Sequence, residues 1–243
     1  MYTLFKKEIN SFLNSLIGYI VLIVFLVITG LFLWVFPVEF NIPDYGYASI
    51  NGLFLIAPWV FLFLIPAITM RSFADERKGG TLELLYTKPI TDVQILTSKF
   101  LASLTLVIIA LIPTIIYYLS VYHLGLPKGN IDSGATWGSY IGLIFLGASF
   151  VAIGVFSSSL SDSQIVSFII SVFLCGFMYI GFEFIYTLSL FGSADLLVKS
   201  LGIQAHYASI SRGVIDTKDL VYFLSVIGLF LLLTKVVMER RKW

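Results

Sequence analysis

Long apolar runs alternate with short polar stretches along the whole sequence. Six of the runs reach the roughly 20 residues that an α-helix needs to cross the hydrocarbon core of a membrane. No long linker, soluble domain or internal repeat interrupts the pattern. The sequence therefore predicts an all-α polytopic membrane protein with a single membrane domain over residues 1–243. We expect its six transmembrane helices at 15–36, 53–70, 100–122, 137–156, 165–182 and 220–238.

A short amphipathic stretch precedes the first span. Phe5, Ile9 and Phe12 recur at helical spacing, whereas Lys6 and Lys7 lie on other faces. This pattern is typical of a helix that lies in the membrane interface, with its lysines near anionic lipid headgroups. The alternative is that the stretch is simply the start of the first span. We favour an N-terminal interfacial helix in contact with membrane lipids.

The polar stretch 73–90 between the second and third spans has the features of a structured segment. It opens with charged residues, continues through a glycine pair and then reaches Thr81, which can cap a short helix that Pro89 ends. The box Thr91–Gln94 is expected to start the next helix. Such a short, partly apolar helix beside a membrane is suited to binding by another protein. The candidate contact residues are Glu76, Arg77, Gly80, Thr81, Leu82, Glu83, Leu85 and Pro89.

The same stretch resembles a signature of ABC-2 type transporter permeases. The matching pieces are Glu76-Arg77, Gly80-Thr81-Leu82-Glu83, Leu84-Leu85 and Pro89-Ile90. The resemblance implies a coupling helix docked on a separate ABC ATPase, expected as a dimer, which binds ATP and Mg. Among subfamilies, the chain is most similar to the permease subunit of the gliding-motility ABC transporter of Bacteroidetes-type bacteria. That similarity implies a second membrane permease or auxiliary subunit with an extracytoplasmic domain.

The distribution of basic residues predicts the orientation. With both termini in the cytoplasm, eleven of the fifteen basic residues fall on the cytoplasmic side, and only Lys128, Lys199, Arg212 and Lys218 fall outside. This bias agrees with the positive-inside rule. We therefore expect a multi-pass protein of the bacterial inner membrane, with the segment 73–90 in the cytoplasm.

Composition excludes several classes of function. Charged residues make up 12% of the chain and hydrophobic residues 58%, whereas a soluble domain carries about 25% charged residues. A glycine-rich phosphate loop is absent, so we expect ATP hydrolysis only from a partner. His123 and His206 lie in different segments without nearby ligands, and Cys175 is the single cysteine. We predict no catalytic residues, no metal site, no cofactor bound by this chain and no nucleic-acid partner.

Several residues allow two interpretations. Pro58 and Pro66 could shape a pathway or merely direct the segment that follows. The G-x-x-x-G pair Gly138 and Gly142 favours packing within the bundle over a subunit interface. Glu183 is expected at an interface, in a segment 183–219 of short interfacial or re-entrant helices. Asp216 and Asp219 are expected to cap the sixth span, and residues 157–164 to form a tight polar turn.

Three other functions stay open for this pattern. The chain could be half of an exporter for a drug, lipid, polysaccharide or ion. It could instead be a non-transporting scaffold that passes ATPase-driven motion to periplasmic proteins. A secondary transporter independent of ATP is disfavoured, because the sequence suggests no paired charges within the spans.

Overall fold

The computed structural model describes residues 1–44, 46–81, 89–189, 192 and 195–240. Within these residues the chain is all-helical, without strands, and contains six helices long and apolar enough to cross a membrane. This confirms the predicted fold class. The six are Leu16–Trp34, Asn51–Lys78, Asp92–Leu124, Ser133–Leu160, Gln164–Thr187 and Thr217–Arg240.

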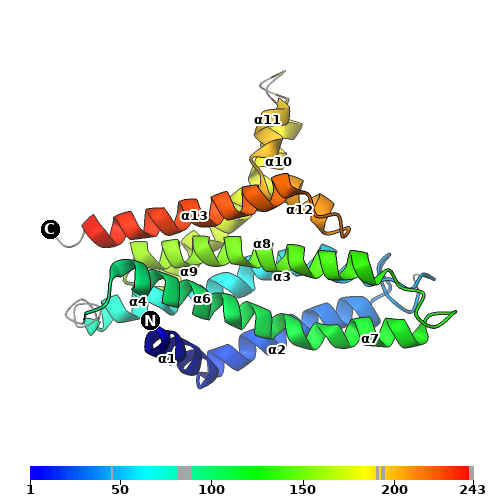
Figure 1. The fold of residues 1–243 in the computed structure, drawn as a ribbon, viewed down its shortest axis with the longest axis horizontal. Helices are drawn as coiled ribbons and strands as arrows, with labels where there is room; N and C mark the ends of the chain where they lie inside the picture. The colour runs from blue at the N-terminus through cyan, green and yellow to red at the C-terminus, as the bar shows by residue number, and fades with distance from the viewer. Residues whose placement is uncertain (45, 82–88, 190–191, 193–194, 241–243) are drawn as a thin grey trace.

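The spans are assembled from shorter elements, most of which lie roughly parallel in one bundle (Figure 1). The N-terminus and the last turn of α13 before Arg240 lie toward the same end of the bundle as α4, and we call this the termini end (Figure 1). In chain order the elements are α1 (Tyr2–Leu13), α2 (Leu16–Trp34), α3 (Asn51–Thr69), α4 (Arg71–Lys78), α6 (Asp92–Leu111), η1 (Ile112–Thr114), α7 (Ile115–Leu124), α8 (Ser133–Leu160), α9 (Gln164–Gly176), η2 (Phe177–Gly181), α10 (Phe182–Thr187), α11 (Asp195–Ser200), α12 (Ile203–Ile210) and α13 (Thr217–Arg240).

Helix α8 is the centre of the bundle and packs against α3, α4, α6, α9, α12 and α13. Its small residues permit this close approach. A Cβ atom on Gly138 would lie 2.7 Å from the carbonyl oxygen of Gly213, and one on Gly142 would lie 2.3 Å from Cγ2 of Ile210. The G-x-x-x-G pair therefore packs within the chain, as its sequence favoured.

The helices extend further into polar sequence than the hydropathy pattern indicates. Helix α6 starts at Asp92, behind the capping box in which Thr91 and Gln94 exchange hydrogen bonds as predicted. The expected turn at 157–164 is wrong in extent, because α8 continues to Leu160. The hydroxyls of Ser157 and Ser159 donate to carbonyl oxygens of their own helix. These polar side chains are therefore satisfied inside α8 and do not require a turn exposed to water.

After α9 the chain leaves the bundle. The π-helical segment η2 redirects it into α10 and α11, which project sideways from the bundle (Figure 1). Helix α12 then leads back toward the start of α13. The described part of 183–219 consists mainly of short helices, as expected, and their interfacial or re-entrant position stays a prediction. Glu183 forms an ion pair with Lys199 at 3.2 Å, and both side chains remain partly exposed.

Candidate functional site

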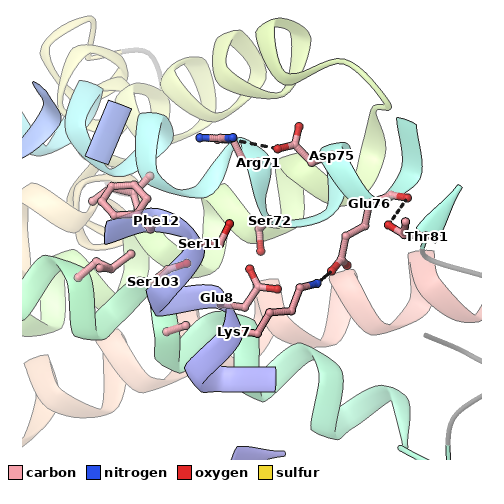
Figure 2. A pocket seen from close by; sticks show the side chains of 13 residues that line it. Lys7, Glu8, Ser11, Phe12, Arg71, Ser72, Asp75, Glu76, Thr81 and Ser103 are labelled. Atoms are coloured by element: carbon pink, nitrogen blue, oxygen red, sulfur yellow. Dashed lines mark hydrogen bonds and ion pairs between the residues drawn. The ribbon is translucent and has the colours of Figure 1, made fainter. Parts of the chain in front are cut away.

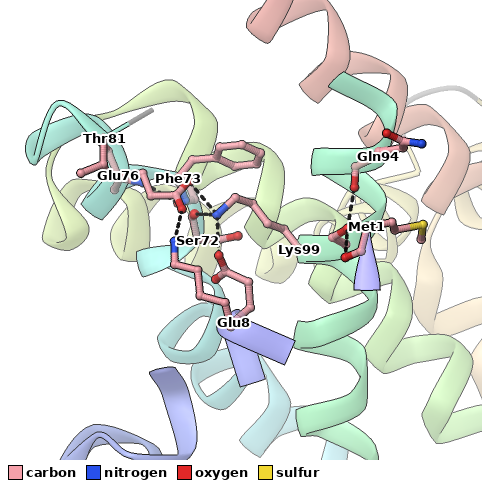
Figure 3. Close-up of polar contacts among 12 residues, drawn as sticks. Met1, Glu8, Ser72, Phe73, Glu76, Thr81, Gln94 and Lys99 are labelled. Carbon is pink, nitrogen blue, oxygen red and sulfur yellow. Dashed lines mark hydrogen bonds and ion pairs between the residues drawn. The ribbon is translucent and has the colours of Figure 1, made fainter. Parts of the chain in front are cut away.

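Four charged side chains from α1, α4 and α6 meet at the termini end, and we call them the charge cluster: Lys7, Glu8, Glu76 and Lys99. The ammonium group of Lys99 lies 2.8 Å from Oε2 of Glu76 and 3.0 Å from Oε1 of Glu8 (Figure 3). It also donates to the carbonyl oxygen of Ser72. Lys7 reaches the other oxygen of Glu76 at 2.9 Å (Figure 2). The cluster thus ties the N-terminal helix to the element that leads into the polar stretch.

Burial makes the charges of this cluster costly in free energy unless they are paired. The side chain of Lys99 is fully buried, and its Nζ lies 5.0 Å from the centre of the Phe73 ring. Two ammonium groups face two carboxylates, so the charges balance. A buried charge is tolerated when it is paired and hydrogen-bonded, and removal of one partner leaves the other uncompensated. The cluster therefore favours one arrangement of α1, α4 and α6.

Lys7 is the member of the cluster closest to solvent. Burial by itself would lower the pKa of Lys7, but the hydrogen bond and the negative charge of Glu76 outweigh it and raise the pKa above its ordinary value. Lys7 therefore stays charged at neutral pH, and its pair with Glu76 persists.

A serine from α8 holds the junction between α3 and α4. The hydroxyl of Ser158 accepts hydrogen bonds from the backbone N–H groups of Phe73 and Ala74, at 2.9 and 3.1 Å. It donates to the carbonyl oxygen of Met70 at 3.0 Å. The first turn of a helix has N–H groups without intrahelical partners, and α4 has no side-chain cap of its own. Ser158 serves as that cap from another helix.

The polar face of α4 contacts the end of α8 and the start of α9. Arg77 lies 3.2 Å from Asp162 through Nε and donates to the carbonyl oxygen of Ser159. Asp75 pairs with Arg71 at 3.1 Å and accepts from the side-chain amide of Gln164. These contacts attach α4 to the core of the bundle on a second side.

A cavity of about 190 Å³ lies beside the charge cluster, between α1, α4 and α6 (Figure 2). Ser11, Arg71, Ser103 and Thr81 contribute to its lining. Thr81 and Glu76, which also lines the cavity, are predicted contact residues. The cavity is therefore adjacent to the predicted contact segment 73–90.

The predicted contact residues fall into three groups. Glu76 and Arg77 point into the chain, where they bind its own helices. Gly80, Thr81 and Pro89 are exposed. Leu82, Glu83 and Leu85 lie outside the described residues, and so does the helix predicted for them. The role of all these residues in partner contact stays a prediction.

The glycine pair ends α4 in a tight turn. Gly80 has φ of +65°, a left-handed conformation that residues with a Cβ rarely adopt. Thr81 donates its hydroxyl to the carbonyl oxygen of Glu76 at 3.2 Å and so satisfies a carbonyl near the end of α4. In the described chain Thr81 closes the preceding helix.

Sequence reasoning missed Glu8, Ser158 and Lys99 as parts of this region. Lys99 was counted only as a basic residue of the termini side, although its place at the head of an apolar run was a usable signal. The expectation of no paired charges within the spans stays a prediction, because Glu76 and Lys99 lie outside the predicted spans 53–70 and 100–122, although their helices extend beyond those bounds. Their place at the termini end identifies a structural contact between helix ends.

Comparison with known proteins assigns the chain to a family. Residues 41–198 match the family described as ABC-2 family transporter protein, a region that runs from before α3 to within α11 and includes α4 and the whole polar stretch. No curated protein matches the chain. Members of this family are membrane components of ABC transporters that normally work with a separate ABC ATPase. The chain belongs to the ABC-2 transporter family and is a multi-pass membrane permease of that kind.

Proposed function

We propose that this permease couples ATP hydrolysis by a separate ABC ATPase dimer to conformational change, and that residues 73–90 are the contact. The observation that carries the proposal is the attachment of α4. It follows α3 almost without a break, Ser158 caps it from α8, and Glu76 ties it to α1 and α6. A force applied just beyond α4 would therefore reach four helices at once.

The proposed orientation has the termini end in the cytoplasm of a bacterial inner membrane. The basic-residue bias supports it, and so does the need of an ATPase for cytoplasmic ATP. The N-terminal helix α1 carries Lys6 and Lys7 on exposed positions at this end, where anionic lipid headgroups would attract them. The ATPase would then meet α4 and the segment after it from the cytoplasm.

The cellular role that we propose is gliding motility, together with a second membrane subunit that carries an extracytoplasmic domain. This rests on the resemblance of the whole chain to the permease subunit of the gliding-motility transporter. Deletion of the gene in a gliding host tests it directly: loss of gliding supports the role, and normal gliding contradicts it.

Cross-linking tests the coupling contact. A cysteine at Thr81 in a Cys175→Ser background is expected to cross-link to the co-expressed ABC ATPase. The matched control is a cysteine at Asn130, in the loop before α8 at the other end of the bundle. Equal cross-linking of the two positions, or none at Thr81 in an intact complex, would contradict the proposed contact.

A further inference from the structure

A second polar cluster lies at the end of the bundle opposite the termini, where α12 meets α13. Nδ1 of His206 lies 2.7 Å from Oδ1 of Asp219, and Nε2 lies 2.8 Å from the carbonyl oxygen of Ser200. The other carboxylate oxygen of Asp219 accepts from the hydroxyl of Ser209. The imidazole ring stacks on Tyr222 with 3.9 Å between ring centroids. These contacts bind α12 to α13 and to the end of α11.

Both ring nitrogens of His206 therefore face hydrogen-bond acceptors. A neutral imidazole has one N–H donor and one lone pair, whereas the imidazolium ion has two donors. With one proton, whichever nitrogen lost its hydrogen would direct a lone pair at an oxygen less than 3 Å away. A carboxylic acid is a stronger acid than an imidazolium ion, so the second proton belongs on the ring and not on Asp219. The geometry matches doubly protonated His206.

Other charges near this cluster are directed elsewhere. Lys199, on α11, pairs with Glu183 and lies over the ring of Tyr186. On α13, Asp216 is exposed and accepts from the backbone N–H of Lys218. From α13, Tyr222 presents its ring face to the imidazole and donates its hydroxyl to Leu201. Asp219 pairs with His206 at 2.7 Å, and among the residues that the structure describes it is the charged partner found for this ring.

Helix α12 also contacts α3 through the next residue. Tyr207 donates to the carbonyl oxygen of Phe54 at 2.8 Å, while His206 holds the other side of α12 on α13. A helix of eight residues is not stable by itself in water, so α12 depends on its contacts with α8, α3 and α13. Weakening of the His206 contact would loosen the packing of α12 on α13.

We propose that His206 and Asp219 form a proton-binding site that locks α12 between α13 and α3. Binding of the proton supplies the second N–H donor, and its loss turns one of the two contacts of His206 into a repulsion. The lock is closed when the ring carries both protons, at lower pH, and opens when one proton is lost, at higher pH. In the proposed orientation the site faces the extracytoplasmic compartment, so external pH sets the packing of α12.

Hydrogen exchange of the full-length chain in phospholipid nanodiscs tests the site. We expect the amides of α12 to lose about tenfold in protection between about pH 5 and about pH 8, after correction for intrinsic exchange rates. His123→Gln is the matched control, because His123 is the only other histidine of the chain and its side chain is exposed. It should leave the pH step unchanged, whereas His206→Gln should abolish the step.

Asp219→Asn gives the sharpest outcome. An asparagine amide can donate to the bare Nδ1 of a neutral imidazole or accept from the imidazolium, so both protonation states are satisfied. We expect this variant to protect α12 at both pH values. The proposal is overturned if wild-type protection is the same at both, or if Asp219→Asn keeps the wild-type pH step. It is also overturned if His123→Gln removes the step.

Discussion

The hydroxyl of Tyr207 donates a 2.8 Å hydrogen bond to the carbonyl oxygen of Phe54, four residues before Pro58. A proline has no backbone N–H, so Pro58 leaves this carbonyl without its helical partner. Tyr207 is itself buried, and burial raises the pKa of its phenol well above the ordinary value. The hydroxyl therefore remains a donor, and it satisfies the gap that the proline creates in α3.

Tyr207→Phe is expected to destabilise the chain by about 1–3 kcal/mol, because the carbonyl of Phe54 would be left buried and unpaired. The shift in the midpoint of thermal unfolding in detergent measures the effect. Tyr19→Phe is the control, since the ring of Tyr19 is exposed at 54%. Equal midpoints for the two variants would contradict the role of the Tyr207 hydroxyl.

Lys99→Met is expected to cost about 3–5 kcal/mol, because Glu8 and Glu76 would lose the buried cation that they share. Thermal unfolding and the amount of inserted protein would both report the loss. Adding Glu8→Gln should recover part of the stability, since it removes the carboxylate that loses its ion pair with Lys99, whereas Glu76 still pairs with Lys7. Failure of this rescue would show that packing, and not charge, explains the effect.

Lys7→Ala should have a much smaller effect, about 0.2–1 kcal/mol, because the side chain of Lys7 is 58% exposed. The pKa of Lys7 is raised, so its contribution is fully present below the ordinary value of 10.5 and is lost only as pH rises through the higher folded value. Unfolding midpoints of the wild type and of Lys7→Ala should therefore differ by a constant amount across the neutral range. A difference that vanished there would contradict the pairing with Glu76.

Ser158→Ala removes the cap of α4 and should cost about 1–3 kcal/mol, because the N–H groups of Phe73 and Ala74 lose their partner. Ser157→Ala is a close control, since the hydroxyl of Ser157 donates only within its own helix, to Ile153. In the assembled transporter we expect Ser158→Ala, and not Ser157→Ala, to lower ATP hydrolysis. Equal stability and equal ATP hydrolysis for the two variants would show that the Ser158 cap has no role in coupling.

Truncation of Leu82 and Leu85 to alanine tests the predicted contact segment. Each side chain, if buried in the partner, contributes about 1.5–3 kcal/mol, and 1.4 kcal/mol is a factor of ten in affinity. The double variant should therefore fail to co-purify the ATPase. Leu224→Ala with Leu232→Ala makes the same chemical change on the exposed face of α13 and should leave recovery unchanged. Normal recovery with the first pair would show that the segment is not the contact.

Local sequence was sufficient for the features that depend on neighbouring residues. Span length follows from hydropathy, and the box of Thr91 and Gln94 follows from spacing within one turn. Contacts between distant residues were not predictable in this way. Ser158 meets the backbone of α4 across 85 residues, and Lys99 meets Glu8 across 91. Which polar residue of a span finds a partner depends on how the helices pack, and hydropathy does not encode that.

The same limit applies to the opposite end. Asp219 was expected only to cap α13, but its two oxygens bind His206 and Ser209 of α12. Asp216 accepts from the N–H of Lys218 and does serve the start of α13. The two aspartates differ because Asp216 precedes α13 and faces solvent, whereas Asp219 lies in its first turn and faces α12, a distinction that requires the position of α12.

The order of the charge cluster along the chain has a consequence for biosynthesis. Lys7 and Glu8 are synthesised first, Glu76 next and the buried Lys99 last. Both carboxylates are therefore at the membrane surface before the lysine emerges from the ribosome, and the helix of Lys99 can insert beside charges that neutralise it. If Lys99 arrived before the two carboxylates, its ammonium group would face lipid unpaired, at a cost of several kcal/mol. We expect the third span to insert stably only after α1 and α4 are in place.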